Sequence, residues 1–524
     1  MRKWLRFNKY KSAKQQASIQ QAAPESGNQE AAIGPLLADN LAELRSRFLH
    51  APDLVIRSFL HAQSGRTAAL AYLEGMTDKN AVNNNVLRPL MFPTDGGDQA
   101  PDLETQPNVQ VNVGSVREIY QWNHLEHALL HGRSVLMLDG MAAAQMYDTQ
   151  GWPQRGLEDP QLEASLKGAH QGFIETLGQN IAMIRRYIPN RELVIKEMMV
   201  GKRAPVKCSI VYLRDIANPE LVGEMENRLQ QVNVDCILNT GELAEYIEDN
   251  PYSPFPQFIL TERPDGAASQ ILQGRICVVL DRSPSVLIGP ASIVSFFQNI
   301  DDYSTRWPVA SFIRLLRCAG FFIAAFLPAI YIALISFNHE VIPLYLILSI
   351  GEYRGRVPFS PLVEAMIMEI TLEMLREAGV RLPTPIGQTV GIVGGIVIGQ
   401  AAVQAGLVSN VMVVVVASTA IASFILPNYD LASAIRLVRF PIMLLSSMFG
   451  IVGIVVGAMA LLGHIISLES LGTPYGSPFA PIRYADWKDT IMRLPLWKMQ
   501  TRPKGVLPLD EQRMATKPPE GGSS

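Results

Sequence analysis

The stretch GIVGGIVIGQAAVQAGLVSN, residues 391–410, is uncharged and apolar enough to lie in a membrane, yet much of it is glycine and alanine. Gly391, Gly395 and Gly399 recur every four residues, so a helix would carry them on one face. Small residues on one face allow a second helix backbone to approach closely. We therefore expect a tightly packed membrane helix here, with its partner helix in the same subunit or in a neighbouring one.

The glycine spacing occurs again later in the chain, and two amides accompany the first occurrence. Gly453 and Gly457 lie four residues apart in a second apolar run. Gln400 and Gln404 lie one helical turn apart inside the first. An amide in hydrocarbon is costly unless it is paired. These glutamines are therefore expected either to hydrogen-bond between helices or to line water.

Long uncharged runs are concentrated after residue 318, which predicts an all-α transmembrane domain over residues 311–470. Residues 319–337 are all uncharged and have about the length that crosses one bilayer core. Residues 341–350 are too short to span alone and predict a short or re-entrant helix. Further spans are predicted at 388–407, 409–427 and 440–467.

Basic residues flank this domain on both sides. Arg314 and Arg317 precede the first span, and six Lys or Arg residues lie between positions 483 and 504. Positive charge collects on the cytoplasmic side of a membrane. Both ends of the domain are therefore expected in the cytoplasm, which requires an even number of crossings, four or six.

The segment SPLVEAMIMEITLEMLREAGVRLP, residues 360–383, has the length of a membrane helix but carries acidic residues. Glu369, Glu373 and Glu377 are spaced by four and form one stripe, with Glu364 further round the helix. A carboxylate at mid-bilayer costs on the order of 3 kcal/mol on insertion scales. These glutamates are therefore expected to avoid lipid.

Two arrangements of this helix keep its acids away from lipid. It lies in the membrane interface with the acids in water, or it crosses the membrane with the acids facing a water-filled path. In an oligomer each glutamate would become a ring, and carboxylate rings select cations. Pairing of Arg376 with Glu369 or Glu373 would weaken such a field. The candidate ion-path residues are Glu364, Glu369, Glu373, Gln400 and Gln404.

The polar first part of the chain predicts two α/β subdomains, at residues 47–190 and 191–300. The expected fold is thus a soluble α/β region followed by a multipass all-α transmembrane domain. A basic, low-complexity tail is expected to be disordered over residues 1–46. Residues 471–524 are expected to form a basic cytoplasmic segment with a disordered end.

Individual elements of the α/β region can be predicted from local signals. NPELVGEMENRLQQV predicts a helix with Asn218 as its N-cap and Pro219 in the first helical position. A longer helix is expected over about 169–187, and another at HLEHALLHG. The strands are predicted at LVIRSFL, AALAYLEG, SVLMLDG, VKCSIVYL, FILT and ICVVLD.

Signals for several other functions are missing from the sequence. The net charge of −3 gives no basic field for nucleic acid. No P-loop, H-E-x-x-H or G-x-S-x-G motif occurs. The four cysteines are far apart and fit neither a disulfide framework nor a zinc ribbon. We therefore expect no enzymatic activity, no cofactor and no metal.

The chain resembles the A subunits of the GerA-type nutrient germinant receptors of endospore-forming bacteria. The resemblance is strongest at residues 358–429, which begin PFSPLVEAMIMEI, and continues upstream in GFIETLGQNIAMIRRYI, EMMVGKRAPVKCSIVYL, TERPDG and GRICVVLDRSPSVLI. These motifs occur in order over about 130–470. The chain departs from the family pattern at KGAHQGF, where an arginine usually precedes the glycine, and at Arg282, where glycine usually follows the aspartate.

The resemblance implies a protein of the inner spore membrane with a two-part cytoplasmic N-terminal region. It implies a homo-oligomer that acts with a permease-like B subunit, which binds the nutrient, and with a lipoprotein C subunit. Such an assembly would be a ligand-gated cation channel that starts germination. The departures leave two branches open, a receptor subunit and the related stage-V sporulation paralogue.

Two further functions fit the same residues. A secondary transporter would use the glutamates as coupling sites, although no internal inverted repeat is evident in the sequence. A scaffold for the receptor cluster would need the glycine faces for assembly but not the glutamates.

Overall fold

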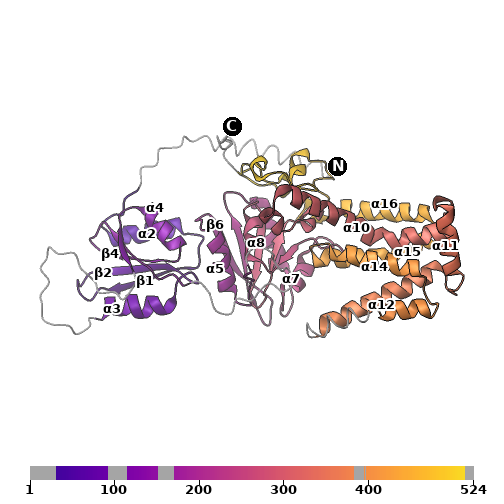
Figure 1. Cartoon of the computed structure of the whole chain (residues 1–524). Coiled ribbons are helices and arrows are strands. Elements are labelled where there is room, and N and C mark those ends of the chain that lie inside the picture. The colour runs from indigo at the N-terminus through magenta and orange to yellow at the C-terminus, as the bar shows by residue number, and fades with distance from the viewer. Residues whose placement is uncertain (1–30, 93–114, 152–169, 383–394, 396, 514–524) are drawn as a thin grey trace, which may run out of the picture. The chain divides into compact units, whose positions relative to one another are not determined.

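The computed structural model describes residues 31–92, 115–151, 170–382, 395 and 397–513. These residues form two compact units. The first comprises Met1–Ser46, Ile56–Tyr72 and Lys79–Gln150, and the second comprises Arg47–Val55, Leu73–Asp78 and Gly151–Ser524. The second unit holds one α/β subdomain, all the apolar helices and the C-terminal segment (Figure 1).

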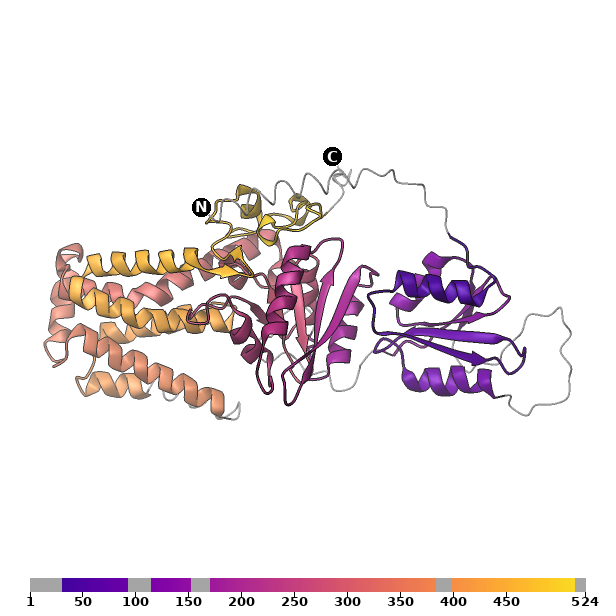
Figure 2. The same cartoon turned by 180° about the vertical axis from the view of Figure 1, so that it is seen from behind.

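The first unit is built on a five-stranded sheet with the strand order β1-β2-β4-β5-β3. Helices α2 and α4 cover one face of this sheet, and η1 and α3 cover the other (Figures 1 and 2). Its elements are α2 (Leu37–Arg47), β1 (Leu54–Leu60), β2 (Thr67–Leu73), η1 (Ala81–Leu87), α3 (Arg88–Met91), β3 (Val116–Ile119), α4 (Trp122–Leu130), β4 (Ser134–Leu138) and β5 (Ala144–Tyr147).

Helix α2 lies within the stretch whose sequence predicts a disordered tail. Leu37 and Leu44 of α2 are buried, so this helix is part of the first unit's core. The folded region therefore begins before residue 47, because a short amphipathic helix gains its stability from the sheet on which it packs. The basic start of the tail, residues 1–30, lies outside the described residues.

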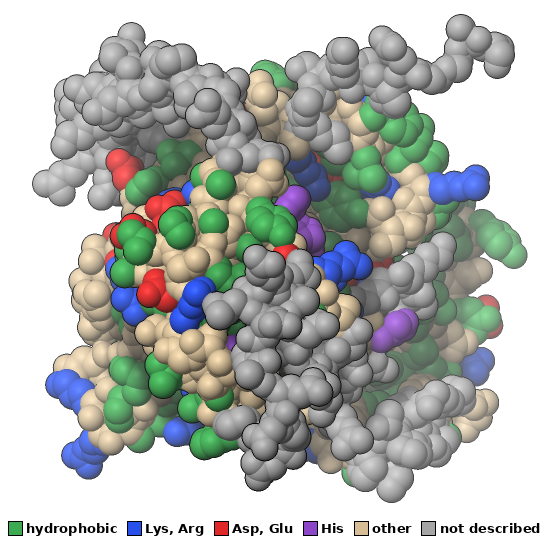
Figure 3. Space-filling model, turned by 90° about the vertical axis from the view of Figure 1, so that its left-hand side faces the viewer, with side chains coloured by type: hydrophobic (Ala, Val, Ile, Leu, Met, Phe, Trp, Pro, Cys, Tyr) green, Lys and Arg blue, Asp and Glu red, His purple; other side chains and the backbone are tan. Residues whose placement is uncertain are grey.

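The side chains on one face of the first unit are mixed in character. In Figure 3, basic, acidic and hydrophobic side chains are interspersed without one large charged field.

The second α/β subdomain has a five-stranded sheet with the order β6-β7-β9-β10-β8. Its paired strands are antiparallel, with Ile210 opposite Val278 and Leu287 opposite Val278 at its centre. Its elements are α5 (Leu177–Tyr187), β6 (Leu193–Val200), β7 (Val206–Leu213), α6 (Pro219–Gln231), α7 (Thr240–Ile247), β8 (Ile259–Thr261), α8 (Pro264–Ile271), β9 (Ile276–Leu280) and β10 (Val286–Gly289).

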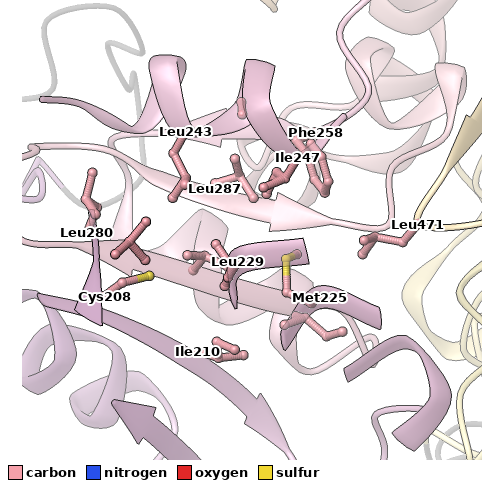
Figure 4. Close-up of a cluster of buried hydrophobic side chains, with 14 of the residues drawn as sticks. Cys208, Ile210, Met225, Leu229, Leu243, Ile247, Phe258, Leu280, Leu287 and Leu471 are labelled. Atoms are coloured by element: carbon pink, nitrogen blue, oxygen red, sulfur yellow. The ribbon is translucent and has the colours of Figure 1, made fainter. Parts of the chain in front are cut away.

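Both faces of this sheet are covered by helices. On one face Met225 and Leu229 of α6 and Leu243 of α7 pack over strand residues such as Cys208 and Leu287 (Figure 4). Helices α5 and α8 form a second core on the opposite face. Helix α6 begins as its sequence predicts, because Asn218 accepts a hydrogen bond from the Glu220 amide at 2.9 Å.

The two sheets share more than strand order. The side chain of Asn40 bonds both the amide and the carbonyl of Gly34, and Asn180 does the same with Ile174. An aspartate follows the central strand of each sheet and accepts a hydrogen bond from the first amide of the helix that precedes the sheet. Asp139 accepts from Leu37 of α2, and Asp281 accepts from Leu177 of α5, both at 3.1 Å. The α/β region is therefore two copies of one folding unit.

The apolar helices run side by side at one end of the second unit, with α12 at the edge of the bundle (Figures 1 and 2). Among the described residues, two helices, α10 and α15, are long and apolar enough to cross a membrane. The elements are α10 (Trp307–Ser336), α11 (Leu344–Arg354), α12 (Pro361–Arg381), α14 (Asn410–Phe424), α15 (Tyr429–Phe449) and α16 (Ile451–Ser467).

The run 440–467, whose hydropathy predicts one span, belongs to two helices. Helix α15 ends at Phe449 and α16 begins at Ile451. Gly450 between them has φ 61° and ψ −137°, a conformation that side chains oppose. Hydropathy alone hides this turn, because apolar residues continue on both sides of it.

The arginines predicted as a cytoplasmic flank are buried in ion pairs at the start of α10. Arg314 lies 2.8 Å from Asp302 of α9 (Asp301–Ser304) and 2.7 Å from Asp489 of the C-terminal segment. Arg317 lies 2.8 Å from Asp302. Because their charge is paired inside the protein, these arginines tie α10 to its neighbours.

The C-terminal segment that supplies Asp489 folds back onto the second α/β subdomain. It contains strands β11 (Glu469–Ser470) and β12 (Thr473–Pro474) and three short 3-10 turns, η4 (Tyr484–Lys488), η5 (Leu496–Lys498) and η6 (Lys504–Val506). Its predicted disordered end lies beyond the described residues from position 514.

Candidate functional site in the helical domain

Helix α12 carries the predicted acidic stripe and lies against α10, α14 and α15. Ser360 caps its first turn, and Pro361 occupies the first helical position, where a missing amide costs nothing. Glu364 and Glu369 are 0% and 2% exposed, whereas the side chains of Glu373 and Glu377 are 34% and 67% exposed. The first half of the helix thus turns its acids into the protein.

Glu364 joins several helices at one end of the bundle. Its Oε2 atom lies 3.1 Å from Nη1 of Arg354 in α11, and its Oε1 atom accepts a hydrogen bond from the Ser409 amide. Ser409 in turn caps α14 and lies 3.2 Å from the hydroxyl of Tyr331 in α10. This carboxylate therefore connects α12 with α11 and with the start of α14.

Glu369 forms an ion pair with Arg439 of α15, and both side chains are buried. Nε of Arg439 also donates to the carbonyl of Ala324 in α10 at 2.8 Å. Ala324 lies four residues before Pro328, which has no amide to bond that carbonyl. Arg439 thus satisfies the acceptor that the proline leaves open.

Glu373 lies between two further arginines. Its Oε1 atom is 2.7 Å from Arg376 on the same helix and 3.3 Å from Arg436 of α15. The guanidinium of Arg376 also stacks over the ring of Phe424 at 5.1 Å. We call the residues Glu369, Glu373, Arg376, Arg436 and Arg439 the arginine–glutamate cluster.

The arginine–glutamate cluster has an excess of positive charge, since three guanidinium groups stand against two carboxylates. Its hydrogen bonding is also incomplete. Oε1 of Glu369 and Nη2 of Arg439 are buried without a partner among the described residues. A buried ion pair recovers its desolvation cost only when its remaining polar atoms are bonded, so this pair is a weak point of the bundle.

The predicted glutamines lie apart from the arginine–glutamate cluster. Gln400 and Gln404 occupy a helical segment over residues 397–404, and both are exposed. The structure thus brings Glu369 and Glu373 together, places Glu364 apart beside Arg354 and Ser409, and leaves the two glutamines at the surface of this chain. Whether they line a path stays a prediction.

The predicted glycine faces have different surroundings. A Cβ on Gly453 would overlap the Leu445 carbonyl oxygen, and one on Gly457 would lie 3.3 Å from Ile442. These two glycines therefore let α16 approach α15 in the same chain.

The glycines of the first run are less enclosed. A Cβ on Gly399 would meet only Val413 of α14 at 3.7 Å, and one on Gly395 would meet nothing within 4 Å among the described residues. Gly391 lies outside those residues. No described residue therefore packs against Gly395.

The predicted pairing of Arg376 with Glu373 is confirmed, but sequence reasoning missed the basic partners of the acidic stripe on other helices. Arg436 and Arg439 lie just before the predicted span at 440, where they look like a flank, and Arg354 follows a short apolar run. A signal was present, because Arg436 and Arg439 lie about one helical turn apart beside an apolar run, as Glu369 and Glu373 do on the facing helix.

The chain matches the family described as Bacillus/Clostridium GerA spore germination protein over residues 42–505. It is 38% identical to Spore germination protein KA of Bacillus subtilis (strain 168) over 488 residues, covering 92% of this chain and 88% of that protein. It is 37% identical to the protein of the same organism named "Uncharacterized membrane protein YfkQ", covering 91% and 92%.

A solved structure also matches the chain. The N-terminal domain of the A subunit of the Bacillus megaterium spore germinant receptor GerK3 is 28% identical and covers 50% of this chain and 98% of that domain, with a TM-score of 0.37.

Proposed function

We propose a function from the premise that the chain belongs to the GerA family of spore germination proteins. The chain is a membrane subunit of a nutrient germinant receptor, and copies of it together form a cation path lined by α12. The observation that carries this proposal is the burial of Glu364 and Glu369 inside a bundle of apolar helices. Ionisable residues at such places commonly mark ion pathways.

The ion pairs suggest how the path is kept shut. In the described arrangement both acids of the arginine–glutamate cluster contact arginines, and the cluster carries net positive charge. Such a cluster repels cations. Conduction therefore requires α12 to separate from α15, which frees Glu369 and Glu373 to face water as rings in an oligomer.

The incomplete bonding of Glu369 and Arg439 lowers the free energy needed for this separation. Each leaves one polar atom unbonded in the closed arrangement, and water in an open path would satisfy both atoms. The free energy lost with the ion pair is thus partly recovered by hydration.

The placement in the membrane is inferred from the ends of the helical domain. Helix α10 begins beside Asp302, and α16 ends where His464 lies 2.8 Å from Ser253 of the same α/β subdomain. Both ends therefore lie on one side of the membrane, which favours an even number of crossings with both termini in the cytoplasm. The membrane is the inner spore membrane.

The partners are a permease-like B subunit and a lipoprotein C subunit, as expected for this family. The nutrient binds the B subunit, and the chain itself carries out no catalytic step and needs no cofactor. The glycine face at Gly395 would contact a second copy of the chain.

The test is planar-bilayer recording of the purified protein under Na⁺ and K⁺ gradients. We expect Glu369→Gln to reduce cation conductance several-fold, because the ring loses its charge. We expect Arg439→Gln to raise the resting cation leak, because it frees the same carboxylate. Misfolding would change the conductance of both variants in the same direction. Opposite changes in Glu369→Gln and Arg439→Gln would therefore indicate an effect on gating.

The matched control is Glu377→Gln, which removes an exposed carboxylate paired with Arg381 on the same helix. It should leave conductance unchanged. Equal conductance in Glu369→Gln, Arg439→Gln and the unmodified protein would rule out this path.

The pairing of the acids also favours a second function, a scaffold for the receptor cluster. In that case the glutamates only hold helices together, so ion flux survives Glu369→Gln. Gly395→Val would instead disperse the complex, and crosslinking of the receptor subunits would show it.

A further inference from the structure

Arg275 lies outside the helical domain, in the turn between α8 and β9, and is 4% exposed. Its Nη2 atom donates to the Ser295 hydroxyl at 2.8 Å. Its Nε and Nη1 atoms are buried without a hydrogen-bond partner in the described part of the chain. A guanidinium offers five N–H donors, and burial normally requires most of them to be bonded.

The charge of Arg275 is also unbalanced. Burial lowers the pKa of its guanidinium to about 10, so the group is still protonated at neutral pH. No carboxylate forms an ion pair with it among the residues that the structure describes, unlike Arg263 and Arg314 of the same subdomain and its border. Burying an unpaired charge costs several kcal/mol, so an anion at this place would be strongly favoured.

A cavity of about 80 Å³ adjoins Arg275, where the C-terminal segment covers the subdomain. One water needs on the order of 10–15 Å³ of such space, so the cavity admits a small oxyanion. Lys488 and Arg513 of the C-terminal segment also line it, and both are exposed.

The acids in the lining of this cavity are engaged elsewhere. Asp489 is bonded to Arg314 and to the Tyr303 hydroxyl. Asp486 accepts hydrogen bonds from the amides of Lys504 and Gly505 at 2.9 and 3.2 Å. The cavity therefore offers an anion basic groups and few competing carboxylates.

The first unit supplies an internal comparison. Gly132-Arg133 precedes β4 as Gly274-Arg275 precedes β9, and both glycines have positive φ. Arg133 is half-buried; its Nη1 atom lies 3.5 Å from the sulfur of Met146, and its Nε atom is buried without a partner among the described residues. The same turn thus holds a partly exposed arginine in one copy and an enclosed arginine, beside a cavity, in the other.

We propose that the cavity beside Arg275 binds a small oxyanion of the phosphate or short-carboxylate class. The anion bridges Arg275 of the subdomain to Lys488 and Arg513 of the C-terminal segment. It thereby holds that segment in place beside Asp489, which pairs with Arg314 at the start of α10. This site is separate from the proposed ion path and does not depend on it.

The test is binding of inorganic phosphate and of malonate to the full-length protein in detergent, measured by isothermal titration at constant ionic strength in a chloride-free buffer. We expect Arg275→Met to weaken binding roughly tenfold or more, because a hydrogen bond to a charged group is lost. Arg133→Met, the equivalent change in the first unit, should leave binding unchanged.

A second variant guards against misfolding of Arg275→Met. Lys488→Gln changes an exposed side chain and should weaken phosphate binding several-fold while the unfolding temperature without phosphate stays the same. Absence of binding to the unmodified protein, or equal binding by Arg275→Met, would overturn the proposal.

An added arm distinguishes a free anion from a lipid headgroup. Phosphatidylglycerol in the micelles should not displace phosphate if the ligand is a small free anion. Displacement would assign the site to the membrane surface and overturn this choice of ligand. Because no channel activity is measured, a failure here is distinct from a failure of the proposed function.

Discussion

The two α/β units have the same strand order and the same internal hydrogen bonds, but they differ where each meets the rest of the chain. In the second unit, the Ser470 hydroxyl donates to the Gln257 carbonyl at 2.6 Å and accepts from the Ala291 amide at 2.9 Å, so the C-terminal segment is bonded to the loops beside β8 and β10. The first unit is described as a sheet of the same strand order with helices on both faces. The comparison shows one strand order used twice, and in the second unit it forms the base of a helical bundle.

The attachment changes the chemistry of the second copy. It encloses Arg275 and requires buried ion pairs such as Arg314 with Asp302. The equivalent arginine of the first copy, Arg133, is half-buried. The second unit therefore encloses its arginine more completely where it carries the helical bundle.

Replacement of Asp302 should give the largest difference in stability between the two units. It is 3% exposed and contacts Arg314 and Arg317, so Asp302→Ala leaves buried charge uncompensated. We expect a loss of about 3–5 kcal/mol in the second unit. Hydrogen exchange should rise in β7 and at the start of α10 but not in β2.

The control for this prediction is Asp235→Ala. Asp235 pairs with Arg203 at 3.1 Å on the surface of the second unit, and an exposed pair contributes at most about 1 kcal/mol. Equal effects of the two substitutions, or a loss of protection in β2, would contradict the assignment of Asp302 to the junction.

A smaller effect tests the shared hydrogen bonds. Asn40→Ala and Asn180→Ala each remove a side chain that bonds an amide and a carbonyl of a buried turn. We expect each to destabilise its own unit by about 1–3 kcal/mol. Limited proteolysis should show faster cleavage in the unit that carries the substitution, and the pattern should swap between the two variants.

The smallest expected effect concerns the residue that follows Asp139 in the first unit and Asp281 in the second, the two aspartates that bond a helix amide. Gly140 and Arg282 occupy equivalent places and have φ of 81° and 67°. A side chain is disfavoured there, so Arg282→Gly should stabilise the second unit by about 0.5–1 kcal/mol. Gly140→Ala should destabilise the first unit by a similar amount, because of its positive φ. The loss should be no larger, because the added Cβ would meet only the side chain of Arg66. Thermal unfolding measures both, and a gain from Gly140→Ala would contradict the equivalence.

Local signals predicted part of the local structure. Asn218 and Pro219 mark the start of α6 as expected, whereas the helix expected over about 169–187 begins only at Leu177. The strand patterns at β1, β4, β7 and β9 also correspond to observed strands. Each of these elements depends on residues within a few positions of one another, which is the range over which caps and periodicity act.

The misses share one physical cause, which is that they depend on contacts distant in sequence. Gly450 divides an apolar run because α16 packs back on α15, with Gly453 against the Leu445 backbone. Arg439 pairs with Glu369 across 70 positions of the chain. The duplication was also missed, although GRSVLMLDG at 132–140 and GRICVVLDR at 274–282 share a glycine, an arginine, a leucine and an aspartate at equivalent places.

Pro328 and Arg439 depend on each other through one such distant contact. The proline leaves the Ala324 carbonyl open, and the arginine bonds that carbonyl while it neutralises Glu369. Each residue contributes less to stability when the other is replaced, so the effects of substitutions at the two positions should not be additive. A family member without Pro328 would have less need of Arg439, so Pro328, Glu369 and Arg439 should vary together among related proteins.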